Sequence, residues 1–150
     1  VLGAGVVRKI VLKNLGINVE GKNICIIGAG ALVGKPLAII FLNKLATVTV
    51  CNSQTVDLKA KCRESEIIVT AAGKKDLLRG NMVSSGTIVI DTGICFENDK
   101  MYGDVNFAEV SKKAGYITPV PGGVGPITVA LLLKNTITCA KRKYGLMDKV

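Results

Sequence analysis

The chain has 150 residues, and its 49% hydrophobic content with a mean hydropathy of +0.42 excludes an intrinsically disordered protein. It contains no histidine and its five cysteines form no C-x-x-C pair, so Cys/His zinc sites and a histidine base are excluded and no metal is expected. The net charge of +9 comes from scattered lysines, densest at residues 141–143, without interleaved aromatic residues. This pattern favours a solvated helix end over a nucleic-acid surface, and the charge would also attract a polyanionic small ligand.

Hydrophobic periodicity predicts helices and strands that alternate along the whole chain, without a linker, repeat or low-complexity segment. Such alternation is typical of one α/β domain with parallel strands and right-handed crossovers. In chain order we expect a helix over 6–15, a strand over 22–28, a helix over 37–45 with Pro36 in its first turn, a strand over 47–51, a helix over 55–63, strands over 66–73, 86–93 and 100–105, a helix over 107–115, a strand over 116–120 and a helix over 126–144.

The cysteine content and the apolar runs bear on location. An odd number of cysteines in strand-like and helical surroundings predicts reduced thiols and therefore a reducing compartment. The apolar runs are too short to span a membrane, and no secretory signal is visible. We therefore expect a cytoplasmic protein without a membrane partner, or a mitochondrial-matrix protein if a targeting segment before Val1 has been removed.

A glycine-rich turn follows the first predicted strand, in the stretch "ICIIGAGALVGKP" (24–36). Gly28, Gly30 and Gly34 form G-x-G-x-x-x-G, in which the third glycine comes one residue later than in the usual dinucleotide-binding fingerprint. Glycines there permit a sharp turn and allow backbone N–H groups to approach a pyrophosphate at the positive end of a helix. Taken alone, the motif fits a purely structural turn equally well.

The ends of the next strands carry polar and small residues. Cys51-Asn52-Ser53 contains no acid of the kind that NAD-selective sites place there, and Ser53 is able to donate to a 2′-phosphate or to form a polar turn with Asn52. Ala71–Gly73 and Asp91–Ile94 follow the third and fourth strands, where open α/β sheets leave room for ligand. For Asp91 a capping or loop role is slightly favoured, and Ile94 either packs or offers backbone groups to a nicotinamide.

The stretch "YITPVPGGVGPITVA" (116–130) resembles the signature of the methylenetetrahydrofolate dehydrogenase/cyclohydrolase family. "VGKP" (33–36), "ATVTVCNS" (46–53), "VIDTGI" (89–94) and "GDVNF" (103–107) occur in the order and spacing of that family. The resemblance extends from about Val6 to Lys143. It implies a Rossmann-like, doubly wound, mostly parallel sheet with helices on both faces, forming one NAD(P)-binding domain over residues 1–150.

The resemblance also implies a reaction and a set of contacts. In the family, a nicotinamide cofactor takes hydride from methylenetetrahydrofolate, and the methenyl product is hydrolysed to the 10-formyl form. The implied cofactor-binding residues are Gly28, Ala29, Gly30, Ser53, Ala72, Gly73, Gly93, Ile94 and Thr128, and the implied substrate-cleft residues are Pro121, Gly122, Gly123, Val124, Gly125 and Pro126.

No catalytic residue is expected within this chain. The family's catalytic Tyr and Lys belong to an N-terminal lobe that has no counterpart here, and residues 1–16 would form the helix that connects to it. Lys35 and Lys74 are expected to be surface residues. The tetrahydrofolate derivative would be bound through the missing lobe, so we expect the chain alone to be inactive, and the resemblance further implies a homodimer.

Departures from the family pattern concern the cofactor. Ala29 and Gly30 stand where the family often has Arg and usually has Ser, and Asn52 stands where it usually has His. Two side-chain donors for phosphate are thereby lost, which leaves NADP, the favoured cofactor, and NAD both open. The alternative prediction is a non-catalytic, degenerate Rossmann interaction module with weak or no cofactor binding.

Overall fold

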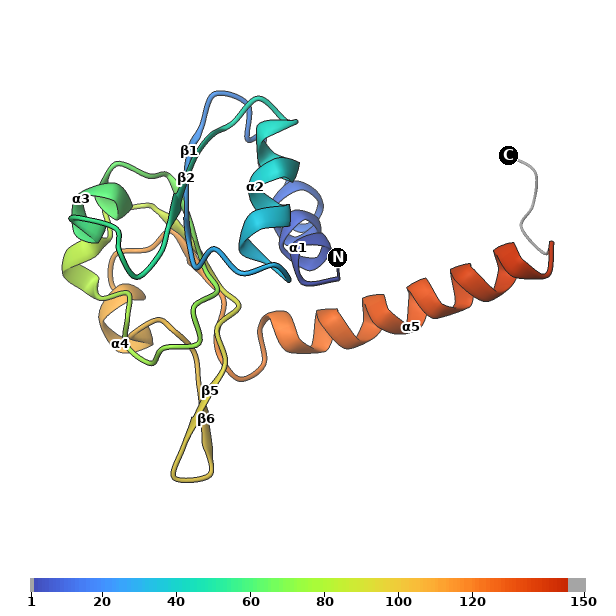
Figure 1. The fold of residues 1–150 in the computed structure, drawn as a ribbon. Coiled ribbons are helices and arrows are strands. Elements are labelled where there is room, and N and C mark those ends of the chain that lie inside the picture. The colour runs from blue at the N-terminus through green and yellow to red at the C-terminus, as the bar shows by residue number, and fades with distance from the viewer. Residues whose placement is uncertain (1, 146–150) are drawn as a thin grey trace.

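The computed structural model describes residues 2–145, and its strands form a five-stranded parallel sheet in the order β2-β1-β3-β4-β7 (Figure 1). After β1 the chain first builds β2 on one side and then crosses over to place β3 on the other side. In open α/β sheets the ligand binds beyond the carboxyl ends of the strands at such a switch point. The five strands are β1 (Asn23–Ile27), β2 (Thr47–Cys51), β3 (Ile67–Thr70), β4 (Ile88–Asp91) and β7 (Tyr116–Ile117).

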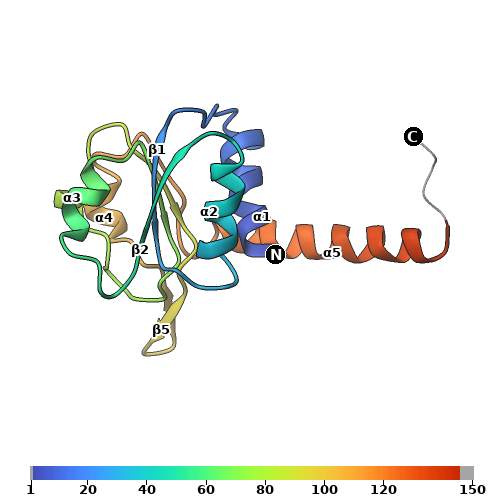
Figure 2. The ribbon, with the colours of Figure 1, turned by 45° about the horizontal axis from the view of Figure 1, so that its top comes forward.

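Helices cover both faces of this sheet (Figures 1 and 2). Helices α1 and α2 and the start of α5 pack on one face, and α3 and α4 pack on the other. The predicted doubly wound, Rossmann-like α/β fold is therefore confirmed. The helical segments are α1 (Leu2–Lys9), the π-helix η1 (Ile10–Asn14), α2 (Gly34–Leu42), α3 (Leu58–Arg63), the 3-10 turn η2 (Gly80–Met82), α4 (Phe107–Val110) and α5 (Val124–Lys143).

The core consists of two hydrophobic layers, one on each side of the sheet. Strand β1 shows the alternation clearly, because Ile24 and Ile26 belong to the layer that contains Phe41 of α2. Cys25 and Ile27 point to the opposite face and belong to the other layer. Each fully buried aliphatic side chain of this kind stabilises the fold by about 1.5–3 kcal/mol relative to exposure.

An antiparallel hairpin projects from the carboxyl edge of the sheet (Figure 1). It consists of β5 (Cys95–Glu97) and β6 (Lys100–Tyr102). The predicted strand over 100–105 is therefore shorter and antiparallel to a partner that the sequence did not predict. The strand predicted over 116–120 is also too long, because β7 stops before two prolines, which lack the N–H that a ladder requires.

The first predicted helix, over 6–15, begins earlier and changes type. The chain is α-helical from Leu2 and then forms one π-helical turn, in which Leu15 N donates to Ile10 O at 2.9 Å. Pro36 lies in the first turn of α2, as predicted. The other bounds differ by a few residues: β1 spans 23–27 instead of 22–28, α2 34–42 instead of 37–45, α3 58–63 instead of 55–63, β3 67–70 instead of 66–73, β4 88–91 instead of 86–93, α4 107–110 instead of 107–115 and α5 124–143 instead of 126–144.

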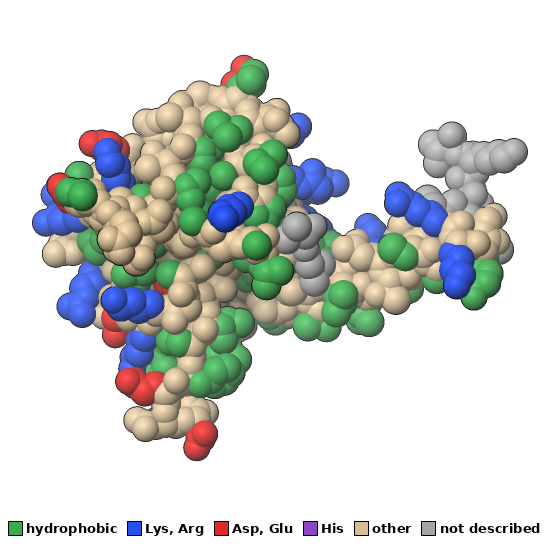
Figure 3. Space-filling view, in the orientation of Figure 1, with side chains coloured by type: hydrophobic (Ala, Val, Ile, Leu, Met, Phe, Trp, Pro, Cys, Tyr) green, Lys and Arg blue, Asp and Glu red, His purple; other side chains and the backbone are tan. Residues whose placement is uncertain are grey.

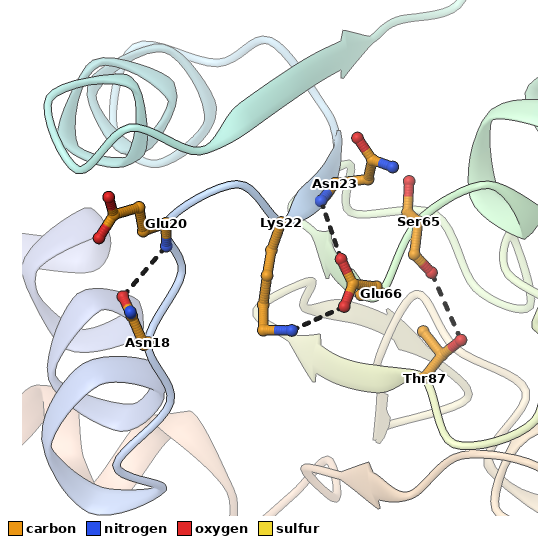
Figure 4. Close-up of polar contacts among 7 residues, drawn as sticks. All are labelled: Asn18, Glu20, Lys22, Asn23, Ser65, Glu66 and Thr87. Atoms are coloured by element: carbon orange, nitrogen blue, oxygen red, sulfur yellow. Dashed lines mark hydrogen bonds and ion pairs between the residues drawn. The ribbon is translucent and has the colours of Figure 1, made fainter.

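At the amino ends of the strands, Glu66 joins the starts of β1 and β3 (Figure 4). Its carboxylate accepts hydrogen bonds from Lys22 Nζ at 2.7 Å and from Asn23 N at 3.2 Å. Nearby, Thr87 Oγ1 donates to Ser65 O at 3.5 Å. This end of the sheet is therefore closed by polar contacts, whereas the carboxyl ends carry the glycine-rich loops.

Helix α5 runs away from the body of the domain (Figures 1 and 3). Val124 at its start is buried, but Val129, Leu132, Leu133 and Ile137 are between 52% and 61% exposed. They form an apolar stripe at helical spacing, which is called the α5 stripe below. No helix within residues 2–145 is long and apolar enough to cross a membrane.

Candidate functional site

The carboxyl ends of four strands lie level with one another. Ile27 of β1 pairs with Cys51 of β2 and with Thr70 of β3, and Thr70 pairs with Asp91 of β4. The loops that follow these residues therefore form a row in the order β2, β1, β3, β4. This row contains every predicted cofactor-binding residue except Thr128, which lies on α5.

Two glycines allow α2 to begin directly above the sheet. Gly28 has φ +115°, and a Cβ there would collide with the carbonyl oxygen of Ala71. A Cβ at Gly34 would collide with the carbonyl oxygen of Gly28. The late third glycine of the motif is thus explained by backbone contact between the start of α2 and the turn. Gly30, in contrast, is exposed, and a Cβ there would meet no atom within 4 Å.

The turn between β1 and α2 presents unpaired backbone donors. The N–H groups of residues 29–33 form no hydrogen bond with any other residue of the described range 2–145. They lie at the amino end of α2, where the helix dipole favours an anion. Ala29 and Gly30 add no side-chain donor to these backbone N–H groups.

The loop after β2 contains Asn52 and Ser53, for which the sequence left open a ligand role or a role in a polar turn. Asn52 builds the turn, because its N donates to Thr55 Oγ1 at 2.8 Å and its Oδ1 accepts from Gln54 N at 2.9 Å. Ser53 is exposed, and its hydroxyl bonds to no other residue in the described part of the chain. The Ser53 hydroxyl is thus available to a ligand, whereas the Asn52 side-chain oxygen is engaged in the turn.

The loop after β3 is held by Asp104, a residue whose role the sequence did not predict. Asp104 accepts hydrogen bonds from Ala72 N at 2.6 Å and from Lys74 N at 2.7 Å. Between them, Gly73 has φ +67°. A Cβ at Gly93 would collide with the Asp104 carboxylate, so the loops after β3 and β4 both pack on this side chain. The motif "GDVNF" marks this segment in the sequence, but it does not show that the aspartate contacts the loop after β3.

Asp91 has a structural role, in agreement with the capping or loop role that the sequence analysis slightly favoured. Its buried carboxylate accepts hydrogen bonds from Thr70 Oγ1 at 2.8 Å and from the N–H groups of Gly93, Asp104 and Val105 at 2.9–3.2 Å. Burial raises the pKa of Asp91 and also that of Asp104, although these hydrogen bonds act in the opposite direction. Among residues 2–145, no three acidic, Cys or His side chains are grouped so as to hold a metal ion.

A cavity of about 590 Å³ lies between the end of β4, the start of α5 and the amino end of α1. Nine of the predicted residues line it, together with Gly3 and Met101, which the sequence did not indicate. The remaining predicted residues (Gly28, Ala29, Gly30, Ser53, Ala72 and Gly73) lie outside its walls, farther along the row of strand ends. The predicted residues in its walls are Gly93, Ile94, Pro121, Gly122, Gly123, Val124, Gly125, Pro126 and Thr128, of which Ile94 is 54% exposed.

The loop over residues 121–126 leads directly into α5. Gly122 has φ +102°, and Gly123 N donates to Pro119 O at 2.9 Å. The Thr128 hydroxyl donates to Val124 O at 2.9 Å, so it stays along the helix. Lys35 and Lys74 are exposed, as predicted, and neither lines the cavity.

The sequence model of the tetrahydrofolate dehydrogenase/cyclohydrolase NAD(P)-binding domain matches residues 3–144, almost the whole chain. The chain belongs to this family. It is the NAD(P)-binding domain of the tetrahydrofolate dehydrogenase/cyclohydrolase, and the resemblance drawn from the sequence is confirmed.

Relatives of this family are about twice as long. The bifunctional protein FolD of Moorella thermoacetica is 48% identical over 134 residues, which are 89% of this chain and 48% of that protein. The crystal structure of the bifunctional FolD enzyme of Campylobacter jejuni is 50% identical with a TM-score of 0.89, covering 95% of this chain and 50% of that one. The Trypanosoma brucei FolD structure, complexed with NADP cofactor and inhibitor, is 41% identical with a TM-score of 0.89, covering 95% and 51%. The chain thus spans about half the length of these relatives.

Proposed function

We propose that this chain binds NADP along the row of strand ends and presents the nicotinamide to a methylenetetrahydrofolate held by another half of the enzyme. The observation that carries this proposal is the turn between β1 and α2, whose N–H groups over residues 29–33 are unpaired within the described residues. They lie at the switch point of the sheet and at the amino end of a helix, which together form a site for a pyrophosphate.

The order of the strands sets the direction of the cofactor. In dinucleotide-binding folds the end of the second strand contacts the adenosine ribose, so the adenosine half would lie beside Ser53. The pyrophosphate would cross the turn at Gly28–Gly30. The nicotinamide half would then reach the loops after β3 and β4 and the cavity, where Gly93 and Ile94 lie.

NADP is favoured over NAD by the loop after β2. The chain places no carboxylate at residues 52 and 53 to repel a 2′-phosphate, and the Ser53 hydroxyl is free to donate to one. The net charge of +9 also favours the more anionic cofactor. A relative from T. brucei has been solved with NADP, which supports the same choice.

The contribution of this chain to the reaction is orientation. When bound, the nicotinamide supplies the hydride acceptor, and the protein supplies position and a dry environment. The loop over residues 121–126 forms one wall of the cavity, so it would set how closely the folate methylene carbon approaches nicotinamide C4. No side chain in this chain is assigned as acid or base.

The acid and base would come from the half of the relatives that this chain does not span. The α5 stripe supplies a surface for that half, since its apolar side chains are exposed and have no partner within residues 2–145. The solved relatives match 95% of this chain within proteins twice as long, which supports the same arrangement. We therefore propose that the chain alone has neither dehydrogenase nor cyclohydrolase activity.

Isothermal titration calorimetry of the purified chain with NADP and with NAD tests the proposal. We expect saturable binding of NADP and weaker binding of NAD, together with no methenyltetrahydrofolate formation from methylenetetrahydrofolate. Silence with both cofactors would favour the alternative, a non-catalytic interaction module. Steady methenyltetrahydrofolate production by the chain alone would contradict the proposal that the catalytic acid and base lie in the half that this chain does not span.

We also propose a homodimer that forms through the edge strand β2. The outer side of β2 has no strand partner within the described residues. Val50 on this strand and Ile39, Leu42 and Leu45 of the adjacent segment are 38–68% exposed. A second copy is able to extend the sheet at this open edge and to cover the apolar side chains beside it.

A further inference from the structure

Two buried carboxylates connect the loops on the nicotinamide side of the row. Asp91 is 2% exposed and Asp104 is 0% exposed. Neither forms an ion pair with any residue of the described range, and their partners are hydroxyl and backbone N–H groups. They lie outside the proposed pyrophosphate turn, within the motifs "VIDTGI" and "GDVNF", and neither is among the cofactor-binding or substrate-cleft residues that the resemblance implies.

The contacts run from strand to strand without a gap. Thr70 at the end of β3 donates to Asp91 at the end of β4, and Asp91 in turn accepts from the backbone of Asp104 and Val105. The Asp104 side chain then returns to the loop after β3, where it accepts from Ala72 N and Lys74 N. The loops after β3 and β4 are thereby fixed to each other.

Two glycines make room for the carboxylates. A Cβ at Gly93 would collide with the Asp104 carboxylate, and a Cβ at Gly103 would collide with Asp91 Oδ2. Burying two carboxylates side by side is costly, because their charges lose water and repel each other. Stability alone would favour apolar side chains at such positions, and local rules are usually broken where function requires it.

We propose that Asp91 and Asp104 are positioning residues that set the loops of residues 71–74 and 92–94 for the nicotinamide half of the cofactor. The inference rests on the proposed function, because the strand order places these loops beyond the pyrophosphate turn. Asp91 lies in the wall of the cavity but is only 2% exposed, and Asp104 is fully buried, so we expect both carboxylates to act without contacting the cofactor. Asp91 acts through the backbone N–H of Gly93, and Asp104 acts through the backbone N–H groups of Ala72 and Lys74.

Binding of a whole cofactor and of its adenosine half separates positioning from general stability. The variant is Asp104→Asn. Its side-chain NH₂ would face one of the two backbone N–H groups that donate hydrogen bonds to the wild-type carboxylate. We expect its affinity for NADP to fall about tenfold, since one buried hydrogen bond to a charged group is lost. Its affinity for 2′,5′-ADP should stay within about twofold of the wild type, because that ligand ends before these loops.

Glu109→Gln provides the matched control. Glu109 also accepts a backbone hydrogen bond through its carboxylate, from Gly80 N at 3.0 Å, but on the face of the sheet covered by α4. We expect this variant to bind both ligands as the wild type does. If Asp104→Asn does not fold, Thr70→Val is the second test variant, because it removes only the hydroxyl that donates to Asp91. We expect its affinity for NADP to fall about threefold and its affinity for 2′,5′-ADP to stay unchanged.

The outcomes are distinct. An Asp104→Asn chain that binds NADP like the wild type, or that loses both ligands equally, overturns the inference and leaves the proposed function standing. A wild-type chain that binds neither ligand overturns the proposed function and the inference with it. A selective loss of NADP affinity, absent from Glu109→Gln, establishes the positioning role.

Discussion

At the scale of single residues, the pKa values of the carboxylates shift in opposite directions at the two ends of the sheet. Glu66 at the amino end is exposed, and its pKa is lowered, first by the hydrogen bond from Lys22 and then by the one from Asn23 N. At the carboxyl end, burial raises the pKa values of Asp91 and Asp104. Ionised Glu66 therefore stabilises the fold, whereas ionisation of the buried Asp91 and Asp104 destabilises it. We attribute the presence of this buried pair to its role in holding the loops after β3 and β4.

Glu66→Gln tests the stabilising role at the amino end. A pKa that is lower in the native than in the unfolded state stabilises the fold above the ordinary Glu pKa, and this contribution is lost as the pH falls through the native value. Because the pair is exposed to solvent, we expect a loss of only about 0.5 kcal/mol in the free energy of unfolding at pH 7.

Urea denaturation of both chains at neutral pH and at about pH 3 measures this effect. The difference between wild type and Glu66→Gln should disappear at the acidic pH and shrink with added salt. Glu64→Gln is the control, since Glu64 forms no ion pair with any residue from 2 to 145. A difference that persists at acidic pH would show that shape, not charge, is responsible.

At the scale of secondary-structure elements, the sequence predicted what local patterns encode. The buried runs of β1, β3 and β4 and the glycine-rich turn were found because each is continuous along the chain. Strand β5 was missed because it has only three residues, of which Phe96 and Glu97 are exposed. The role of Asp104 was missed because it depends on a contact with Ala72, 32 positions away, that no local pattern records.

The third glycine of the turn gives the element-scale prediction. We expect Gly34→Ala to destabilise the domain by about 1–3 kcal/mol, because its Cβ would overlap the Gly28 carbonyl and push α2 off the sheet. NADP binding should weaken as well, since the N–H groups of residues 29–33 would move with the helix.

Gly30→Ala is the matched control for this change. Its Cβ would meet no atom within 4 Å and its φ is not positive, so the free energy of unfolding should change by less than about 0.5 kcal/mol. Thermal and denaturant unfolding of the two variants measures the difference. Equal stability of Gly34→Ala and Gly30→Ala would show that the start of α2 is able to yield, and that the late glycine is not required by packing.

At the scale of the whole molecule, the domain leaves two surfaces without partners among the described residues. The α5 stripe faces away from the body, and the edge of β2 is open (Figures 1 and 3). We propose that the first surface contacts the half of the relatives that this chain does not span. The second has the open backbone that symmetric pairing with another copy requires, and stable dimers bury about 1,600 Å² in total.

Val50→Lys tests the dimer at the edge strand. Pairing of two β2 strands across a twofold axis brings their side chains together, so a lysine there places like charges opposite each other and blocks the edge. Sedimentation equilibrium should give twice the chain mass of 15.7 kDa for the wild type and the single mass for Val50→Lys. Val56→Lys makes the same substitution at a residue that is 85% exposed and lies outside β2, and it should remain dimeric. A wild-type chain that stays monomeric at micromolar concentration, or a Val50→Lys chain that stays dimeric, would exclude β2 as the interface.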